Sequence, residues 1–101
     1  MKYVTKFSEI EELNGVVVVD FWAEWCGPCK MLAPTYEAVA GKLSDVATFC
    51  KANVDDARDL AMEYGVSAIP TVVVIKDGAE VARKVGLVSA DVLEELVKSA
   101  L

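Results

Sequence analysis

Trp25-Cys26-Gly27-Pro28-Cys29-Lys30 places two cysteines, separated by two residues, just after the apolar run that ends at Trp22. The stretch opens a segment, residues 28–43, with the apolar spacing of an amphipathic helix. A thiol at a helix start lies near unpaired backbone N–H groups and the positive end of the helix dipole. Both stabilise the thiolate, which is the nucleophile of disulfide exchange. The stretch therefore predicts a reactive dithiol at a helix N-terminus.

The two residues between the cysteines suit this position and bear on the direction of the chemistry. Pro28 is tolerated in the first helical turn, where its missing N–H costs no helical bond, and Gly27 leaves the approach to the sulfur open. Pro28 also removes one donor to the thiolate, and the chain has no histidine to add positive charge. A less stabilised thiolate gives a more reducing couple. We therefore assign Gly27 and Pro28 a redox-tuning role and expect electron donation.

Half of a zinc site is the structural alternative for the cysteine pair. Structural zinc takes four ligands, usually Cys or His. The chain has no His and only one further cysteine, Cys50, so a redox pair without metal or other cofactor is favoured. Cys26 comes first and is expected to be the exposed attacking thiol, with Cys29 the buried resolving thiol. Cys50 is interpreted as a small buried residue, with a regulatory or dimer-forming thiol as the alternative.

Length and charge restrict the class of protein further. A chain of 101 residues that is 54% hydrophobic is expected to form a single folded domain, residues 1–101. The net charge of −6 argues against nucleic acid or an anionic membrane as a partner. No segment has the length of a membrane span. The odd cysteine count and the lack of an apolar N-terminal run favour a reducing cytoplasm.

Strand-like and helix-like segments alternate along the chain. Residues 16–23 are apolar on both faces, which is typical of a central strand covered on both sides. Ser8 and Glu11 have the spacing of a capping box for a short helix, and Ser89 is expected to cap a last helix that buries Val92. The other expected strands are residues 2–6, 45–54, 71–75 and 79–85, and the other expected helix is residues 56–64. This order predicts an α/β protein with one mixed sheet and helices on both faces.

The chain resembles the thioredoxin family over nearly its whole length. The motifs that carry the resemblance are Asp20-Phe21-Trp22-Ala23-Glu24-Trp25-Cys26-Gly27-Pro28-Cys29-Lys30, Pro34, Lys51-Ala52-Asn53-Val54-Asp55, Ile69-Pro70-Thr71, Asp77-Gly78 and Gly86. A lone Cys-x-x-Cys would be weak evidence for a family, but this set of motifs in this order is specific. The resemblance implies the thioredoxin fold, a central five-stranded mixed β-sheet flanked by four α-helices.

Asp20 is a carboxylate within the apolar central strand, where a buried charge is costly. Burial raises a carboxyl pKa towards neutrality and would suit Asp20 as general acid/base for Cys29. The resemblance supports this role, with Lys51 nearby as a modulator. The alternative is that Asp20 faces outward at the strand end or is simply paired by Lys51.

The resemblance also implies a substrate-docking surface. Pro70 would follow a cis peptide bond beside the dithiol, and the backbone of Ile69 would pair with an extended substrate segment. The apolar residues of this surface would be Trp25, Gly27, Pro28, Ile69, Pro70, Val85, Gly86 and Leu87. Trp22 is assigned to the core.

Together these observations predict a monomeric, cytoplasmic protein-disulfide reductase that carries electrons as a dithiol. The resemblance implies disulfide-containing client proteins as substrates and a thioredoxin reductase, fed by NADPH or ferredoxin, as the electron source. An oxidase or isomerase with the same fold is one alternative. A docking module without turnover is the other.

Overall fold

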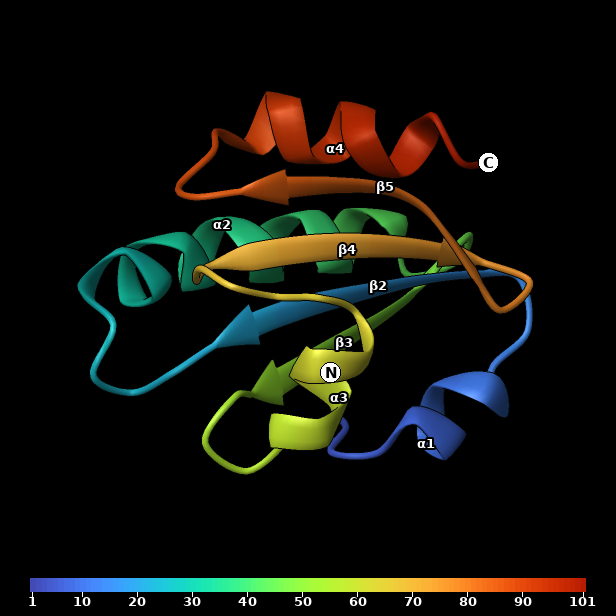
Figure 1. Cartoon of the computed structure of the whole chain (residues 1–101). Helices are drawn as coiled ribbons and strands as arrows, with labels where there is room; N and C mark the ends of the chain where they lie inside the picture. The colour runs from blue at the N-terminus through green and yellow to red at the C-terminus, as the bar shows by residue number, and fades with distance from the viewer.

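The computed structural model describes all residues from 1 to 101, which form one five-stranded sheet between two layers of helices (Figure 1). The elements are β1 (Lys2–Tyr3), α1 (Phe7–Glu11), β2 (Val16–Trp22), α2 (Gly27–Leu43), β3 (Thr48–Asn53), α3 (Arg58–Glu63), β4 (Thr71–Lys76), β5 (Ala79–Val85) and α4 (Ala90–Lys98). The strand order is β1-β3-β2-β4-β5. β3 runs parallel to both β1 and β2, whereas β4 is antiparallel to β2 and β5. The expected mixed sheet with four helices is confirmed. No helix combines the length and the apolar character needed to cross a membrane.

The central strand β2 is buried on both faces because helices cover each of them. Val16 and Val18 belong to a core cluster with side chains of α2 and α4, including Leu32 and Leu93. The alternate residues of β2 pack on the other face, against side chains of α1 and α3 such as Ile10 and Leu60. Because side chains alternate along a strand, Asp20 lies on the α2 face with Val16 and Val18.

The first helix begins one residue before the expected cap. Glu9, and not Glu11, caps α1, since Glu9 Oε1 accepts the backbone N–H groups of Thr5 (3.0 Å) and Lys6 (3.1 Å). The expected Ser8–Glu11 capping box is therefore wrong. Glu9 stands three residues after Lys6, the residue that precedes the helix, which is the spacing needed for a side chain to reach back to that N–H.

Four other expectations need correction at element ends. The strand expected over residues 2–6 covers only Lys2–Tyr3. The strand expected from Asp45 begins only at Thr48, because the N–H groups of Val46 and Ala47 bond to Leu43 O in the turn that closes α2. The helix expected from Asp56 begins at Arg58 after a similar turn. In α4, Ser89 caps as expected, with Val92 N donating to Ser89 Oγ at 3.3 Å. Val92 itself is 38% exposed, because it lies in the first turn and away from the sheet.

Candidate active site

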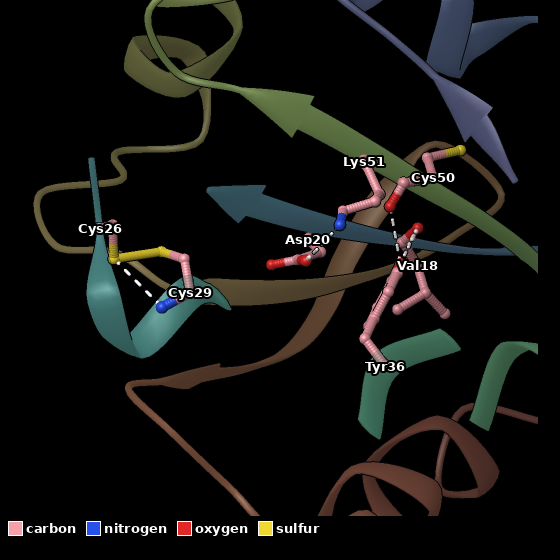
Figure 2. Close-up of polar contacts among 7 residues, drawn as sticks. All are labelled: Val18, Asp20, Cys26, Cys29, Tyr36, Cys50 and Lys51. Carbon is pink, nitrogen blue, oxygen red and sulfur yellow. Dashed lines mark hydrogen bonds and ion pairs between the residues drawn. A yellow bond between two sulfur atoms is a disulfide. The ribbon is translucent and has the colours of Figure 1, made fainter. Parts of the chain in front are cut away.

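The cysteine pair lies at the N-terminus of α2, as the sequence predicts. Cys26 is the N-cap residue, and its Sγ accepts the backbone N–H of Cys29 at 3.2 Å (Figure 2). The two residues form a disulfide with a Cα–Cα distance of 5.3 Å. Pro28 occupies the first turn of the helix, and no acidic residue lies there. In the reduced protein, the same N–H and the helix dipole would stabilise a thiolate on Cys26.

Both cysteines are buried, which corrects the expectation of an exposed Cys26. The relative exposure is 6% for Cys26 and 3% for Cys29. They form a small apolar cluster with Ala23, and Trp22 and Ile69 pack against it. The loop before β4 covers Cys26, since Ile69 packs against this cluster. Trp22, which we assigned to the core, is only partly buried at the edge of this cluster.

The loop before β4 brings Ile69 and Pro70 to the dithiol. The Ile69–Pro70 peptide bond is cis, as the resemblance implies. The carbonyl oxygen of Ile69 lies 3.8 Å from Cys26 Sγ. At its end the loop is tied to the chain after β5, because Gly86 N donates to Pro70 O at 2.7 Å. The structure therefore brings together three segments that are far apart in the sequence.

The surface around the dithiol is apolar and partly exposed. Trp25, Val85 and Leu87 have relative exposures of 69%, 59% and 49%. Gly27 and Pro28 are exposed, Ile69 and Gly86 are half-buried, and Pro70 is buried. Pro70 is therefore covered, and its half-buried neighbour Ile69 contributes to the surface.

Asp55 belongs to this site although we assigned it no role from the sequence. Trp25 Nε1 donates to Asp55 Oδ2 at 2.9 Å, which fixes an exposed indole beside Cys26. Asp55 N in turn donates to Asn53 Oδ1 at 3.0 Å. The only signal in the sequence was its place in the Lys51–Asp55 motif, and spacing alone does not link that motif to Trp25.

Asp20 lies on the α2 face of β2, below the helix that carries Cys29. Figure 2 shows its carboxyl group between Lys51 and Cys29. Asp20 is 1% exposed, and neither of its oxygens has a hydrogen-bond partner. Burial raises the pKa of Asp20 to about 6, while the charge of Lys51 opposes the rise. The alternative of an outward-facing Asp20 is excluded by this burial, and the pairing with Lys51 is present.

Lys51 stands directly opposite Asp20 on the parallel strand β3. Its Nζ lies 4.0 Å from Asp20 Oδ2 and 4.9 Å from the centre of the Trp22 ring. A distance of 4.0 Å is too long for a strong direct hydrogen bond, so the two groups attract mainly through their charges.

Cys50 lies away from the dithiol, on β3 opposite Lys2 of the edge strand β1. It is fully buried and unpaired, and burial raises its pKa to about 11. Its carbonyl oxygen accepts the hydroxyl group of Tyr36 at 2.7 Å, and the same hydroxyl lies 3.1 Å from Val18 O (Figure 2). These features fit a structural residue. No group of three or more His, Cys, Asp or Glu side chains could hold a metal ion.

The site joins a disulfide at a helix N-terminus, a cis-proline loop against its first sulfur and a buried carboxyl group behind it. This arrangement defines a thiol-disulfide oxidoreductase, because it places two cysteines within bonding distance of each other at a helix N-terminus, where a thiolate is stabilised.

Comparison with known proteins agrees with this class. The family model named Thioredoxin matches residues 3–99. The thioredoxin of Mycoplasmoides gallisepticum is 43% identical over 97% of this chain and 100% of its own length. The thioredoxin of Bacillus subtilis is 45% identical over 90% of this chain and 88% of its own. The crystal structure of Fasciola hepatica thioredoxin superposes with a TM-score of 0.90 at 39% identity, over the full length of both chains. The chain belongs to the thioredoxin family.

Proposed function

We propose that this oxidoreductase acts as a protein-disulfide reductase in which Cys26 attacks and Cys29 resolves. The observation that carries the proposal is the position of Cys26 as N-cap of α2, with its sulfur 3.8 Å from the carbonyl oxygen of Ile69. The Cys26 thiolate attacks one sulfur of a client disulfide, forms a mixed disulfide and releases the first client thiolate. Cys29 then attacks Cys26 Sγ, which closes the intramolecular disulfide and releases the second client thiolate. Two electrons pass from the dithiol to the client.

In this scheme Asp20 is the general acid/base for Cys29. Cys29 must lose its proton before it can attack, and a carboxyl group with a pKa near 6 accepts that proton at neutral pH better than an ordinary aspartate would. The position of Asp20 on the α2 face and the lack of hydrogen bonds to its oxygens support this role. Lys51 tunes it, because its positive charge favours the ionised carboxylate.

The few donors around Cys26 support electron donation by the dithiol. Only the N–H of Cys29 donates to Cys26 Sγ, and Pro28 has no N–H to add. The thiolate is therefore only moderately stabilised, and a moderately stable dithiol is a good reductant. This supports a reductase over an oxidase or isomerase.

Client proteins would dock on the apolar surface formed by Trp25, Gly27, Pro28, Ile69, Pro70, Val85, Gly86 and Leu87. An extended client segment beside the disulfide would pair with the backbone at Ile69. A thioredoxin reductase would return electrons to the Cys26–Cys29 disulfide. We further propose that residues 1–101 act as a single-domain monomer in the cytoplasm, where glutathione and thioredoxin systems keep thiols reduced.

The reduction potential of the Cys26–Cys29 couple tests this function, together with the rate of insulin reduction by dithiothreitol. A reductase should have a potential more negative than about −200 mV, and a more positive value would favour an oxidase or isomerase. A Cys26→Ser/Cys29→Ser double variant should lose all catalysis of insulin reduction. If the double variant still replaces the wild-type protein in cells although it cannot reduce insulin, the protein is a docking module.

A further inference from the structure

Arg83, on β5, contacts both Glu80 of the same strand and the end of α3. Its guanidinium group binds Glu80 through two hydrogen bonds, Nε to Oε2 and Nη2 to Oε1, both at 2.6 Å. Nη2 also donates to the backbone carbonyl oxygen of Tyr64. A bidentate pair of this kind holds the planar guanidinium in one orientation. The hydrogen bond from Arg83 also lowers the pKa of Glu80, so the pair stays ionised at neutral pH.

Tyr64 is the residue at which the chain leaves α3. The helix closes with Gly65 N bonded to Met62 O at 3.0 Å and Val66 N bonded to Ala61 O at 2.9 Å. Gly65 has a φ of +62°, which reverses the chain there. The carbonyl of Tyr64 remains available at the negative end of the helix, where a cation is favoured. Arg83 supplies that cation.

The α3–β4 loop, residues 65–70, starts at this point and ends at the dithiol. Its start is held by Arg83 through Tyr64 O, and its end is held by Gly86 through Pro70 O. Both ends are therefore fixed to the same edge strand, β5, and its continuation. Thr71, the first residue of β4, also holds the loop, because its Oγ1 donates to Ala68 O at 2.6 Å. Between these anchors lies Ile69, whose carbonyl is the part of the loop nearest to Cys26 Sγ.

We propose that Arg83, oriented by Glu80, is a positioning residue that holds the α3–β4 loop in the geometry needed to bind a client segment at Ile69. The proposal rests on the function proposed above. Arg83 does not touch the reacting sulfurs and acts only through the loop. Without the Arg83 contact the start of the loop is held only by the backbone hydrogen bonds of Gly65 and Val66, so a client must order more of the loop when it binds, and client affinity falls. The sulfur chemistry at the helix N-terminus is unchanged.

Arg83→Gln separates these effects when it is assayed on a protein disulfide, with dithiothreitol as reductant, and on a small disulfide, with the pre-reduced protein as the only reductant. Insulin, a protein substrate, should show a KM higher by about two- to fivefold with nearly unchanged kcat, the scale of a partly exposed charge contact. The small aromatic disulfide DTNB is mixed with the pre-reduced protein after dithiothreitol has been removed, because dithiothreitol reduces DTNB directly. DTNB makes few contacts with the loop and should react at the wild-type rate. Arg83→Lys keeps a donor for Tyr64 O and should recover part of the insulin affinity. Lys84→Gln, an exposed neighbour on the same strand, is the matched control and should behave as wild type.

Amide hydrogen exchange supplies a readout independent of activity. In Arg83→Gln the amides of Ser67, Ala68 and Ile69 should exchange faster than in wild type and in Lys84→Gln, while those of β2 stay protected. The proposal is overturned if KM for insulin is unchanged, if both disulfides are affected equally, or if loop exchange does not change. Failure of the wild-type protein itself to reduce insulin would instead overturn the proposed function.

Discussion

Asp20 and Lys51 face each other across two neighbouring parallel strands, with 4.0 Å between Asp20 Oδ2 and Lys51 Nζ, and both side chains are buried. Desolvation dominates at Asp20, because its pKa is raised to about 6 in spite of the lysine. The site therefore holds a carboxyl group that is partly protonated close to neutral pH. Such a group costs stability when it ionises, which makes it measurable by unfolding as well as by kinetics.

Asp20→Asn should change stability in a pH-dependent way. The folded pKa of about 6 lies above the ordinary value of 3.8, so the folded state binds the proton more tightly than the unfolded chain. As the pH rises from the unfolded pKa to the folded pKa, the free energy of unfolding of the wild type falls, by up to about 3 kcal/mol in total. Asp20→Asn has no such loss. Denaturant unfolding at pH 3 and pH 8 should show the variant close to wild type at pH 3 and more stable than wild type at pH 8.

The same variant should reduce insulin more slowly, because Cys29 loses its proton acceptor. An effect of about tenfold or more would fit general base catalysis. A variant that is less stable than wild type at pH 8 and fully active would show that Asp20 is an ordinary paired carboxylate.

The order of attack predicts which cysteine variant traps clients. Cys29→Ser should accumulate mixed disulfides through Cys26, because the resolving thiol is absent. Cys26→Ser should accumulate none. Non-reducing gels and mass spectrometry after incubation with a disulfide-bonded protein would identify the adducts. The reverse pattern would exchange the roles of the two cysteines.

Most of the fold could be predicted because its signals are local. The β2 segment is apolar on both faces, Asp77-Gly78 gives the positive φ values of 50° and 87° that its turn requires, and Ser89 caps its helix. The capping box was mispredicted because two glutamates have the same spacing from a possible cap, Glu9 from Lys6 and Glu11 from Ser8, and spacing does not choose between them. Burial of Cys26 could not be predicted, since the Ile69 loop that covers it is 43 residues away in sequence. The Trp25–Asp55 and Arg83–Tyr64 contacts are equally non-local.

Cys50 should be chemically inert and replaceable. Its pKa of about 11 keeps it a thiol at pH 8, and its side chain is fully buried. Iodoacetamide at pH 8 should therefore label reduced Cys26 well before Cys50, as peptide mapping would show. Cys50→Val should reduce insulin at the wild-type rate and change the free energy of unfolding by no more than about 1–2 kcal/mol. Rapid labelling of Cys50, or loss of activity in a folded variant, would indicate a functional thiol.

Tyr36→Phe tests the buried hydroxyl that links two strands. The Tyr36 hydroxyl lies within bonding distance of Val18 O and Cys50 O, and phenylalanine preserves the ring contact with Phe49 (ring centroids 5.7 Å apart). The variant should lose about 1–2 kcal/mol of stability, the usual range for a buried hydrogen bond. Urea unfolding measures this loss. Unchanged stability would show that the hydroxyl contributes nothing net.

Lys51→Met isolates the other half of the buried pair. Lys51 lowers the pKa of Asp20, so its removal should raise that pKa above about 6. The rate of insulin reduction should rise with pH as Asp20 ionises, and in Lys51→Met this rise should move to higher pH. The rate at pH 6 should be about twofold lower than that of wild type, and the rate at pH 8.5 little changed. The variant should also be less stable than wild type at pH 8 by about 1–3 kcal/mol, because an ionised Asp20 is left without its counter-charge.

Lys76→Met, which replaces an exposed lysine at the end of β4, is the control and should change neither property. In an Asp20→Asn background, Lys51→Met should no longer shift the pH profile, because no carboxyl group remains to respond. A shift that persists in this double variant would mean that Lys51 acts on Cys29 directly, and the coupling through Asp20 would be wrong.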